Sequence, residues 1–184
     1  MKNLFICLVA SLSLSTAFAE VSYSMPSIEG GFKWNSMDVD TSTANKQALG
    51  LQFGGSIVIN FNQDFGLRTG LFYSERPFKA EFGPGVDASG KITYADIPLH
   101  IMFKLEDYAG IYLGPSIATK IGDESSGIAL TGVQSMITPI TFGAAFKFQE
   151  NMGLNIFFET IGSKLANGIT ASRGIGANFM FTFN

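Results

Sequence analysis

Strict alternation of apolar and other side chains, without any long apolar run, is the feature that most constrains this chain. From residue 95 to residue 105 every odd position is apolar, and the even positions include Asp96, His100 and Lys104. A period of two predicts a β-strand with one apolar face. Eleven residues also suit a tilted strand that crosses a bilayer. Residues 49–61 repeat this pattern, and so do residues 175–183.

Alternation also explains the composition. Hydrophobic residues make up 46% of the chain, and the mean hydropathy is +0.25. No stretch after residue 19, however, approaches the roughly 20 apolar residues of a spanning helix. Further alternating segments bring the expected number of strands to eight; they are residues 28–34, 65–74, 109–117, 140–148 and 154–159.

The first 19 residues have the features of a secretory signal. Lys2 is followed by an apolar stretch over residues 4–14, and Ala17-Phe18-Ala19 is a small-x-small cleavage site. We therefore expect cleavage after Ala19 and a mature domain over residues 20–184; an uncleaved anchor helix is the alternative. The only cysteine, Cys7, lies within this signal, so the mature chain has no disulfide.

Short and long connections alternate between the expected strands. The short ones are residues 62–64, 106–107 and 149–151, and the long polar ones are residues 36–46, 76–90, 121–132 and 163–172. Outer-membrane barrels have short periplasmic turns and long outer loops in this way. The expected fold is all-β, an eight-stranded antiparallel up-and-down transmembrane β-barrel in the bacterial outer membrane. Pro98, Pro115 and Pro139 fall inside strands, where we expect bulges or ladder breaks.

A soluble lipocalin-type barrel would also have eight antiparallel strands. The apolar face of this chain is bulky in every strand, whereas the other face is rich in Gly, Ala and Ser. An eight-stranded barrel has an interior just wide enough for side chains to fill. The bulky face would overfill it, so we expect that face to point outward into lipid.

Charged residues on the inward face should form a salt-bridged plug, because buried charges need partners. A narrow ion path or a gate is the alternative. The expected members are Glu29, Lys33, Arg68, Asp96, His100, Lys104, Lys147 and Glu159. Asp96 and His100 are four residues apart on one strand, roughly 13 Å, too far for a catalytic hydrogen bond. With one His and no mature Cys, we expect no thiol chemistry, no metal site and no cofactor. An enzyme would need a polar cluster at the outer rim, and because the sequence offers no convincing one we expect no enzyme activity.

Aromatic residues near the expected strand ends should form the interfacial girdle. They are Trp34, Tyr73, Tyr94 and Tyr108. Loop 76–90 begins with Arg76-Pro77-Phe78, and its aromatic residues either contact a partner or fold over the barrel mouth.

Two segments resemble a known family. Tyr94-Ala95-Asp96-Ile97-Pro98-Leu99, followed by Gly110-Ile111-Tyr112-Leu113-Gly114-Pro115, is similar to the strand pair of PorT-like outer-membrane β-barrel proteins. The overall plan resembles the small OmpA/OmpX-type barrels. Phe179, Phe181 and Phe183 resemble the C-terminal signal by which such barrels are inserted, although Asn184 follows where the family usually ends in Phe.

The expected function is a non-enzymatic structural or surface-interaction role carried by long extracellular loops. A small passive pore and a soluble periplasmic lipocalin-like carrier are the alternatives, and an outer-membrane enzyme is a more remote one. The expected partners are outer-membrane lipid and lipopolysaccharide, the barrel-assembly machinery during insertion, and a surface protein. A formal charge of −3 argues against nucleic acid.

Overall fold

A computed structural model describes residues 22–183, except 24–25, 41, 107 and 128. The expected signal at residues 1–19 lies outside the described residues. No helix among those described is long and apolar enough to cross a membrane. The strands are β1 (Ser22–Tyr23), β2 (Ser27–Val39), β3 (Ala44–Lys46), β4 (Ala48–Asn60), β5 (Phe65–Glu81), β6 (Asp87–Pro98), β7 (His100–Glu106), β8 (Ala109–Ser126), β9 (Met136–Ile137), β10 (Ile140–Lys147), β11 (Met152–Ile161) and β12 (Ile169–Thr182).

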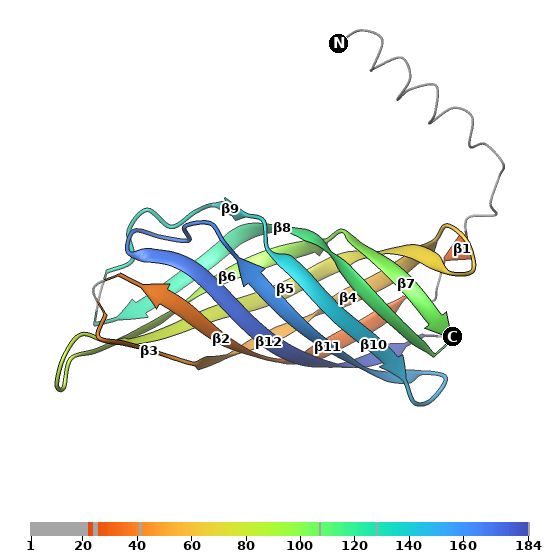
Figure 1. Cartoon of the computed structure of the whole chain (residues 1–184), viewed down its shortest axis with the longest axis horizontal. Coiled ribbons are helices and arrows are strands. Elements are labelled where there is room, and N and C mark those ends of the chain that lie inside the picture. The colour runs from red at the N-terminus through yellow and green to blue at the C-terminus, as the bar shows by residue number, and fades with distance from the viewer. Residues whose placement is uncertain (1–21, 24–25, 41, 107, 128, 184) are drawn as a thin grey trace, which may run out of the picture.

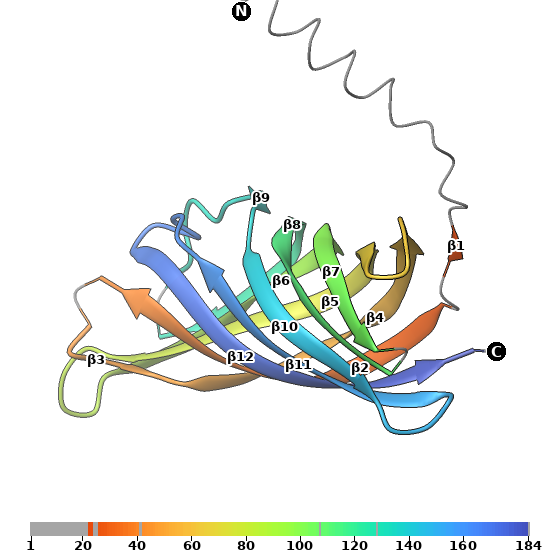
Figure 2. The same ribbon diagram turned by 45° about the vertical axis from the view of Figure 1, so that its right-hand side comes forward.

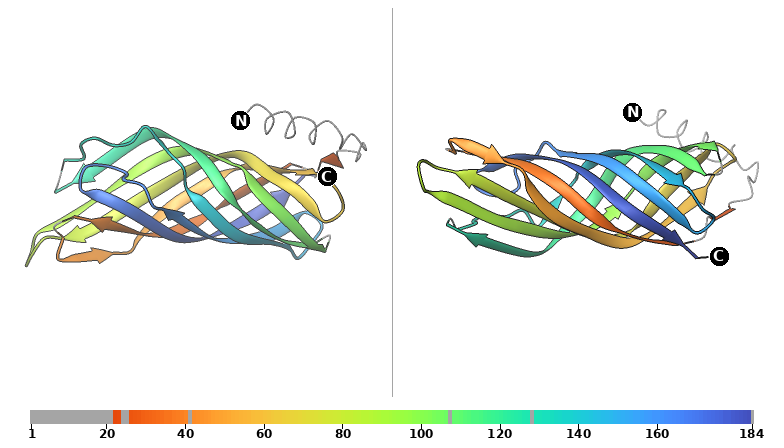
Figure 3. Two further views of the ribbon diagram at one scale, coloured as in Figure 1. Left: turned by 45° about the horizontal axis from the view of Figure 1, so that its top comes forward. Right: turned by 90° about the horizontal axis from the view of Figure 1, so that it is seen from below.

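These strands form a closed antiparallel barrel (Figure 1). Three of its eight long strands are interrupted, so that β3 continues into β4, β6 into β7, and β9 into β10. Closure is made by β2, which pairs with β4 on one side and with β12 on the other. Ile28 lies opposite Gly55 in one ladder and opposite Phe181 in the other. The expected eight-stranded antiparallel barrel is confirmed. Its strands are inclined to the long axis (Figure 3).

The three short connections lie at the end of the barrel that holds the C-terminus, on the right in Figure 1. The β4–β5 turn is stabilised by Asn62, whose side-chain oxygen accepts hydrogen bonds from the backbone N–H groups of Asp64 and Phe65, at 2.9 and 2.7 Å. Such an Asx turn explains why a polar Asn begins the connection.

The opposite end is more regular than expected. Strand β5 continues to Glu81 and β6 begins at Asp87, so the expected loop 76–90 is a hairpin with a turn at residues 82–86. This hairpin reaches furthest to the left in Figures 1 and 2. Strand β8 likewise runs to Ser126. The predicted long polar connections are therefore partly β-structure, because alternate residues of the extensions still pack their apolar side chains inward, as Phe78 and Ile92 do.

Two of the three prolines coincide with breaks between strands. Strand β6 ends at Pro98, and Pro139 lies in the gap between β9 and β10. Pro115 lies inside β8, but the ladder on one side of it is interrupted, because β8 pairs with β7 up to Leu113 and with β6 only from Ser116 onward; the predicted local break is therefore found here too. The Pro115 carbonyl oxygen keeps a contact across strands by accepting the Leu99 N–H at 2.9 Å.

The two faces of the barrel wall differ as predicted. Bulky apolar side chains lie outside, including Ile101, Leu113 and Phe142, which are 63%, 56% and 54% exposed. Polar side chains lie inside, where Glu29 and Lys33 are almost completely buried. An outer surface of this kind is unfavourable in water and favourable in lipid.

Candidate functional site

Four layers of side chains follow one another along the barrel interior. From the C-terminal end these are an open vestibule, a cluster around Glu29, a cluster around Arg76, and an apolar layer at the hairpin end.

The Arg76 cluster lies around a fully buried guanidinium. Arg76 donates to both oxygens of Asp96, at 3.1 and 2.7 Å, and to both oxygens of Glu159, at 3.1 and 2.8 Å. The Lys33 ammonium donates to Glu159 at 3.0 Å and to the Ser74 hydroxyl at 2.8 Å. The planar guanidinium suits this double role, because its fork of N–H donors can bind carboxylates in a bidentate manner.

Arg76 is not among the predicted interior residues, because the polar segment 76–90 predicts a surface loop there. Its position nevertheless follows the parity of its own strand. Arg68 and Phe72 of β5 face the interior, and Arg76 continues the same even-numbered series. Extending the alternation of residues 65–74 by two more positions would have found it.

The Glu29 cluster is held by hydrogen bonds to a single carboxylate. One oxygen of Glu29 accepts from Arg68 and from the Ser56 hydroxyl, both at 2.5 Å. The other oxygen accepts from the Asn155 amide at 2.8 Å, and Asn155 in turn accepts from the Tyr112 hydroxyl at 2.7 Å. The Arg68 guanidinium also lies over the Tyr112 ring, 4.8 Å from its centre.

Glycine leaves room for this arrangement at one position. A Cβ atom on Gly143 would lie 2.4 Å from Cζ of Tyr112, closer than real contacts allow. The small residues of the inward face therefore allow the long side chains to fill the lumen.

His100 lies between the two clusters. Its ring stacks on Tyr112 with centres 5.1 Å apart, and Nε2 shares a hydrogen bond with the Ser116 hydroxyl at 3.1 Å. A cavity of about 20 Å³ adjoins it, bordered also by Gln52 and Asn178. Such a volume holds about one water molecule. Asp96 is engaged by Arg76, so the structure does not pair Asp96 with His100.

At the hairpin end an apolar cluster, here the outer apolar cluster, fills the lumen. Phe78 is 1% exposed in it, so this aromatic residue folds over the barrel mouth rather than projecting to a partner. Leu130 and Val133, from the β8–β9 connection, pack against the cluster. Its buried members are Met37, Val39, Phe78, Ala80, Ile92, Tyr94, Ala118, Ile137, Ile161, Leu165, Ala166 and Ile169.

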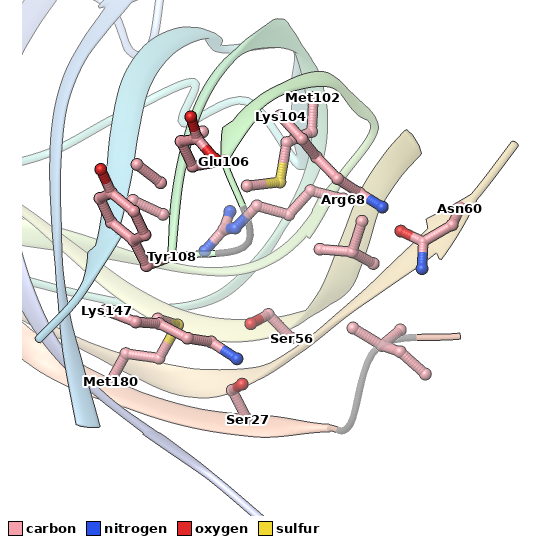
Figure 4. Close-up of a pocket in the computed structure, with 15 residues that line it drawn as sticks. Ser27, Ser56, Asn60, Arg68, Met102, Lys104, Glu106, Tyr108, Lys147 and Met180 are labelled. Atoms are coloured by element: carbon pink, nitrogen blue, oxygen red, sulfur yellow. The ribbon is translucent and has the colours of Figure 1, made fainter. Parts of the chain in front are cut away.

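Tyr94 corrects the predicted girdle. It is completely buried, with Arg76 5.1 Å from its ring centre and its hydroxyl donating to the Gln134 carbonyl oxygen at 3.1 Å. An even-numbered residue of β6 faces the interior, as Asp96 does, and cannot reach the lipid interface. Trp34 is 48% exposed on the outer wall, as a girdle residue must be, whereas Tyr108, 53% exposed, lines the edge of the vestibule (Figure 4) and packs edge-on against Phe146.

The remaining aromatic predictions lie on the outer wall. Tyr73 stacks on Phe53 with ring centres 4.7 Å apart. Phe179, Phe181 and Phe183 are 46%, 39% and 45% exposed along and just after β12. Their role as an insertion signal stays a prediction.

Lys104 and Lys147 correct the predicted charge network. Both are half buried and line the vestibule at the C-terminal end, together with Met102, Glu106 and Met180 (Figure 4). The vestibule has a volume of about 170 Å³. Neither ammonium forms an ion pair with a carboxylate of a described residue. Both lysines face inward, but they lie too near the end of the barrel to join the deeper clusters.

A modest test of the Glu29 cluster is Tyr112→Phe. This variant removes the hydroxyl and leaves the buried oxygen of Asn155 without that donor, so the free energy of unfolding should fall by about 1–3 kcal/mol. Urea titration of the protein refolded in lipid vesicles would measure it. The matched variant Tyr108→Phe alters an exposed tyrosine and should change the same quantity by less than about 0.5 kcal/mol. Equal effects for the two variants would contradict a role for the Tyr112 bond.

The comparisons with known proteins agree with this geometry. A family model described as outer membrane protein beta-barrel domain matches residues 18–183. Among curated proteins, no significant match is found.

Among the described residues, no group of three or more His, Cys, Asp or Glu side chains could hold a metal ion.

Several solved structures are similar in fold. Neisserial surface protein A shares 15% identity at a TM-score of 0.55, over 88% of this chain and 99% of that one. Ail, the attachment invasion locus protein of Yersinia pestis, shares 18% identity at a TM-score of 0.49, over 86% and 99%. OprG from Pseudomonas aeruginosa shares 10% identity at a TM-score of 0.46, over 89% and 99%.

Proposed function

Since the chain belongs to the family of outer membrane protein β-barrel domains and lies in the bacterial outer membrane, we propose that it is a sealed, non-enzymatic barrel with a structural or surface-interaction role. In such barrels the short turns face the periplasm and the longer connections face outward. The vestibule then opens to the periplasm, and the hairpin end is extracellular.

The filled lumen is the observation that carries this proposal. In the Arg76 and Glu29 clusters, Lys33, Arg68 and Arg76 meet Glu29, Asp96 and Glu159, so the charges balance. Beyond them, the outer apolar cluster closes the extracellular mouth. A passive pore needs a continuous water-filled path through the lumen. The ion-paired clusters fill that path in the middle of the barrel, and the outer apolar cluster fills it at the extracellular mouth. The exposed apolar wall likewise argues against a soluble lipocalin-like carrier.

The extracellular extension supports an interaction role. It carries ion pairs between partly exposed lysines and acidic residues, with Lys91 2.9 Å from Glu75, Lys120 2.7 Å from Asp123, and Lys46 bonded to Glu81. The hydrogen bond to Glu75 raises the pKa of Lys91, so this ammonium stays protonated near neutral pH. Its rigid, charged strands are suited to contact lipopolysaccharide or a surface protein. The barrel-assembly machinery as a partner, and the finer PorT-like kinship, stay predictions.

Conductance distinguishes the sealed barrel from a pore. The wild-type protein in planar lipid bilayers should give no steady current steps, because no continuous polar path crosses the lumen. A large porin, whose aqueous channel is open, serves as the positive control. Neutralising Arg68 or Glu159 should reduce stability without creating an ordered channel. Steady steps of wild-type protein that change on these substitutions would favour the pore instead.

Complementation of a deletion strain distinguishes the structural role from the surface-interaction role. A strain lacking the protein would be complemented with wild type or with a variant whose hairpin turn, residues 82–86, is replaced by glycine and serine. Outer-membrane integrity would be measured by uptake of a hydrophobic dye, and surface contacts by attachment of the cells. Restored integrity with lost attachment would indicate surface interaction. If the variant restores both, the hairpin is dispensable and the role is structural.

A further inference from the structure

The periplasmic vestibule contains positive charge that is not paired in the Arg76 and Glu29 clusters of the sealed barrel. Lys104 enters it from β7 and Lys147 from β10, on different walls of the pocket (Figure 4). Arg68 lies deeper and is bound to Glu29. The carboxylate that lines the vestibule among the described residues is that of Glu106, which is exposed at its edge. Two ammonium groups therefore line one pocket that has an excess of positive charge (Figure 4).

The rest of the vestibule lining combines polar side chains, among them Ser27, Ser56 and Asn60, with apolar ones. Met102 and Met180 lie beside the lysines, and Ala109 and Ala145 belong to the apolar part of the lining. Methionine side chains adapt their shape to what they contact. The pocket is about 170 Å³, and an apolar cavity of roughly 150 Å³ accommodates a molecule the size of benzene. The occupant that fits is therefore small, with an anionic group and a short apolar part.

We propose that the vestibule is a binding site for a small organic anion, a phosphate or carboxylate joined to a short apolar group, that enters from the periplasm. Lys104 and Lys147 bind the anionic group, and the methionines contact the apolar part. Arg68 remains with Glu29, so binding leaves the plug in place. The inference depends on the orientation of the barrel but not on whether its outer surface binds a partner.

The methionines report binding directly. Mature protein labelled with ¹³C at the methionine methyl groups, in nanodiscs of zwitterionic lipid, would be titrated with butyl phosphate. We expect saturable shifts of the Met102 and Met180 signals, whereas Met37 and Met136, at the extracellular end, stay unchanged. Inorganic phosphate should bind more weakly and butanol should cause no saturable shift. Equal responses to butanol and butyl phosphate would overturn the proposal, because the lysines would then have no role.

Charge substitution supplies the second test. The double variant Lys104→Gln/Lys147→Gln should weaken binding of butyl phosphate by about tenfold or more, since charge-assisted hydrogen bonds are lost. Lys79→Gln/Lys164→Gln removes two exposed extracellular lysines and should bind as wild type does. Unchanged affinity in the vestibule variant would overturn the proposal. If that variant fails to fold, added salt must weaken binding to wild type, and salt-independent binding would overturn it equally.

A third arm identifies the source of the anion. Nanodiscs containing anionic phosphatidylglycerol would be compared with zwitterionic ones, without added butyl phosphate. Shifts of Met102 and Met180 in the anionic lipid alone would assign the site to a lipid headgroup. Shifts only after addition of butyl phosphate would assign it to a soluble periplasmic anion. Conductance is measured separately, so a conducting barrel would refute the sealed-barrel function without deciding this site.

Discussion

Replacing Arg76 with leucine is expected to lower the free energy of unfolding by about 3–5 kcal/mol, because it removes one partner of a buried ion pair. The guanidinium forms four hydrogen bonds to Asp96 and Glu159. Glu159 keeps Lys33 as a partner, whereas Asp96 loses its ion-pair partner in an interior with little water. Urea titration in lipid vesicles would measure the loss, with the shift in gel mobility between unheated and boiled samples reporting the folded barrel.

A double substitution tests that explanation. In Arg76→Leu/Asp96→Leu the uncompensated carboxylate is gone, so most of the lost stability should return, as expected where apolar residues replace a buried pair. The matched control is Lys91→Leu, which breaks the pair of this partly exposed ammonium with Glu75 and should cost much less than Arg76→Leu. A double variant as unstable as Arg76→Leu would show that the guanidinium acts by filling space rather than by charge.

Placing a charge on the lipid-facing wall should have the second large effect. Leu113 is 56% exposed on the outward face of β8 and is the fifth residue of that strand, near the middle of the roughly 9–11 residues that a strand needs to cross the bilayer. Leu113→Arg should lower the free energy of unfolding by about 2–4 kcal/mol, the cost of a cation near the bilayer midplane.

Depth in the membrane supplies the control. Ile121 is 57% exposed on the same strand, eight residues further toward the extracellular end. Ile121→Arg should cost about 0–1 kcal/mol, because the cost falls near the interface. Similar small losses for both variants in lipid vesicles would mean that Leu113 does not face the hydrocarbon.

Most of the correct predictions follow from whether a residue occupies an odd or an even position of its strand. Two of the errors arise where this rule is not applied. Arg76 and Tyr94 both occupy even positions of strands whose even positions face inward. The polar segment 76–90 places Arg76 in a predicted loop, and the predicted strand end at residue 95 places Tyr94 in the predicted girdle. In both cases the strand continued further than the polar composition suggested.

The alternation of a strand predicts which face a side chain is on, but not how deep in the barrel it lies. Lys104 and Lys147 face inward as predicted, but they lie in the vestibule rather than in the charged clusters. The ion pair of Lys33 with Glu159 joins residues 126 positions apart. Whether two inward charges meet depends on strand register and tilt around the closed ring, which no single strand contains.

The sequence by itself determined that the chain forms an alternating, closed β-barrel with its bulky apolar face outward. It could do so because alternation is local, and because lipid tolerates no open strand edge. Only the tertiary structure decided that Arg76 joins Asp96 to Glu159, that Glu29 binds Arg68, and that two lysines line a separate vestibule. The physical reason is that ion pairing depends on distances of a few ångströms between different strands, and these distances are set by how the whole ring closes.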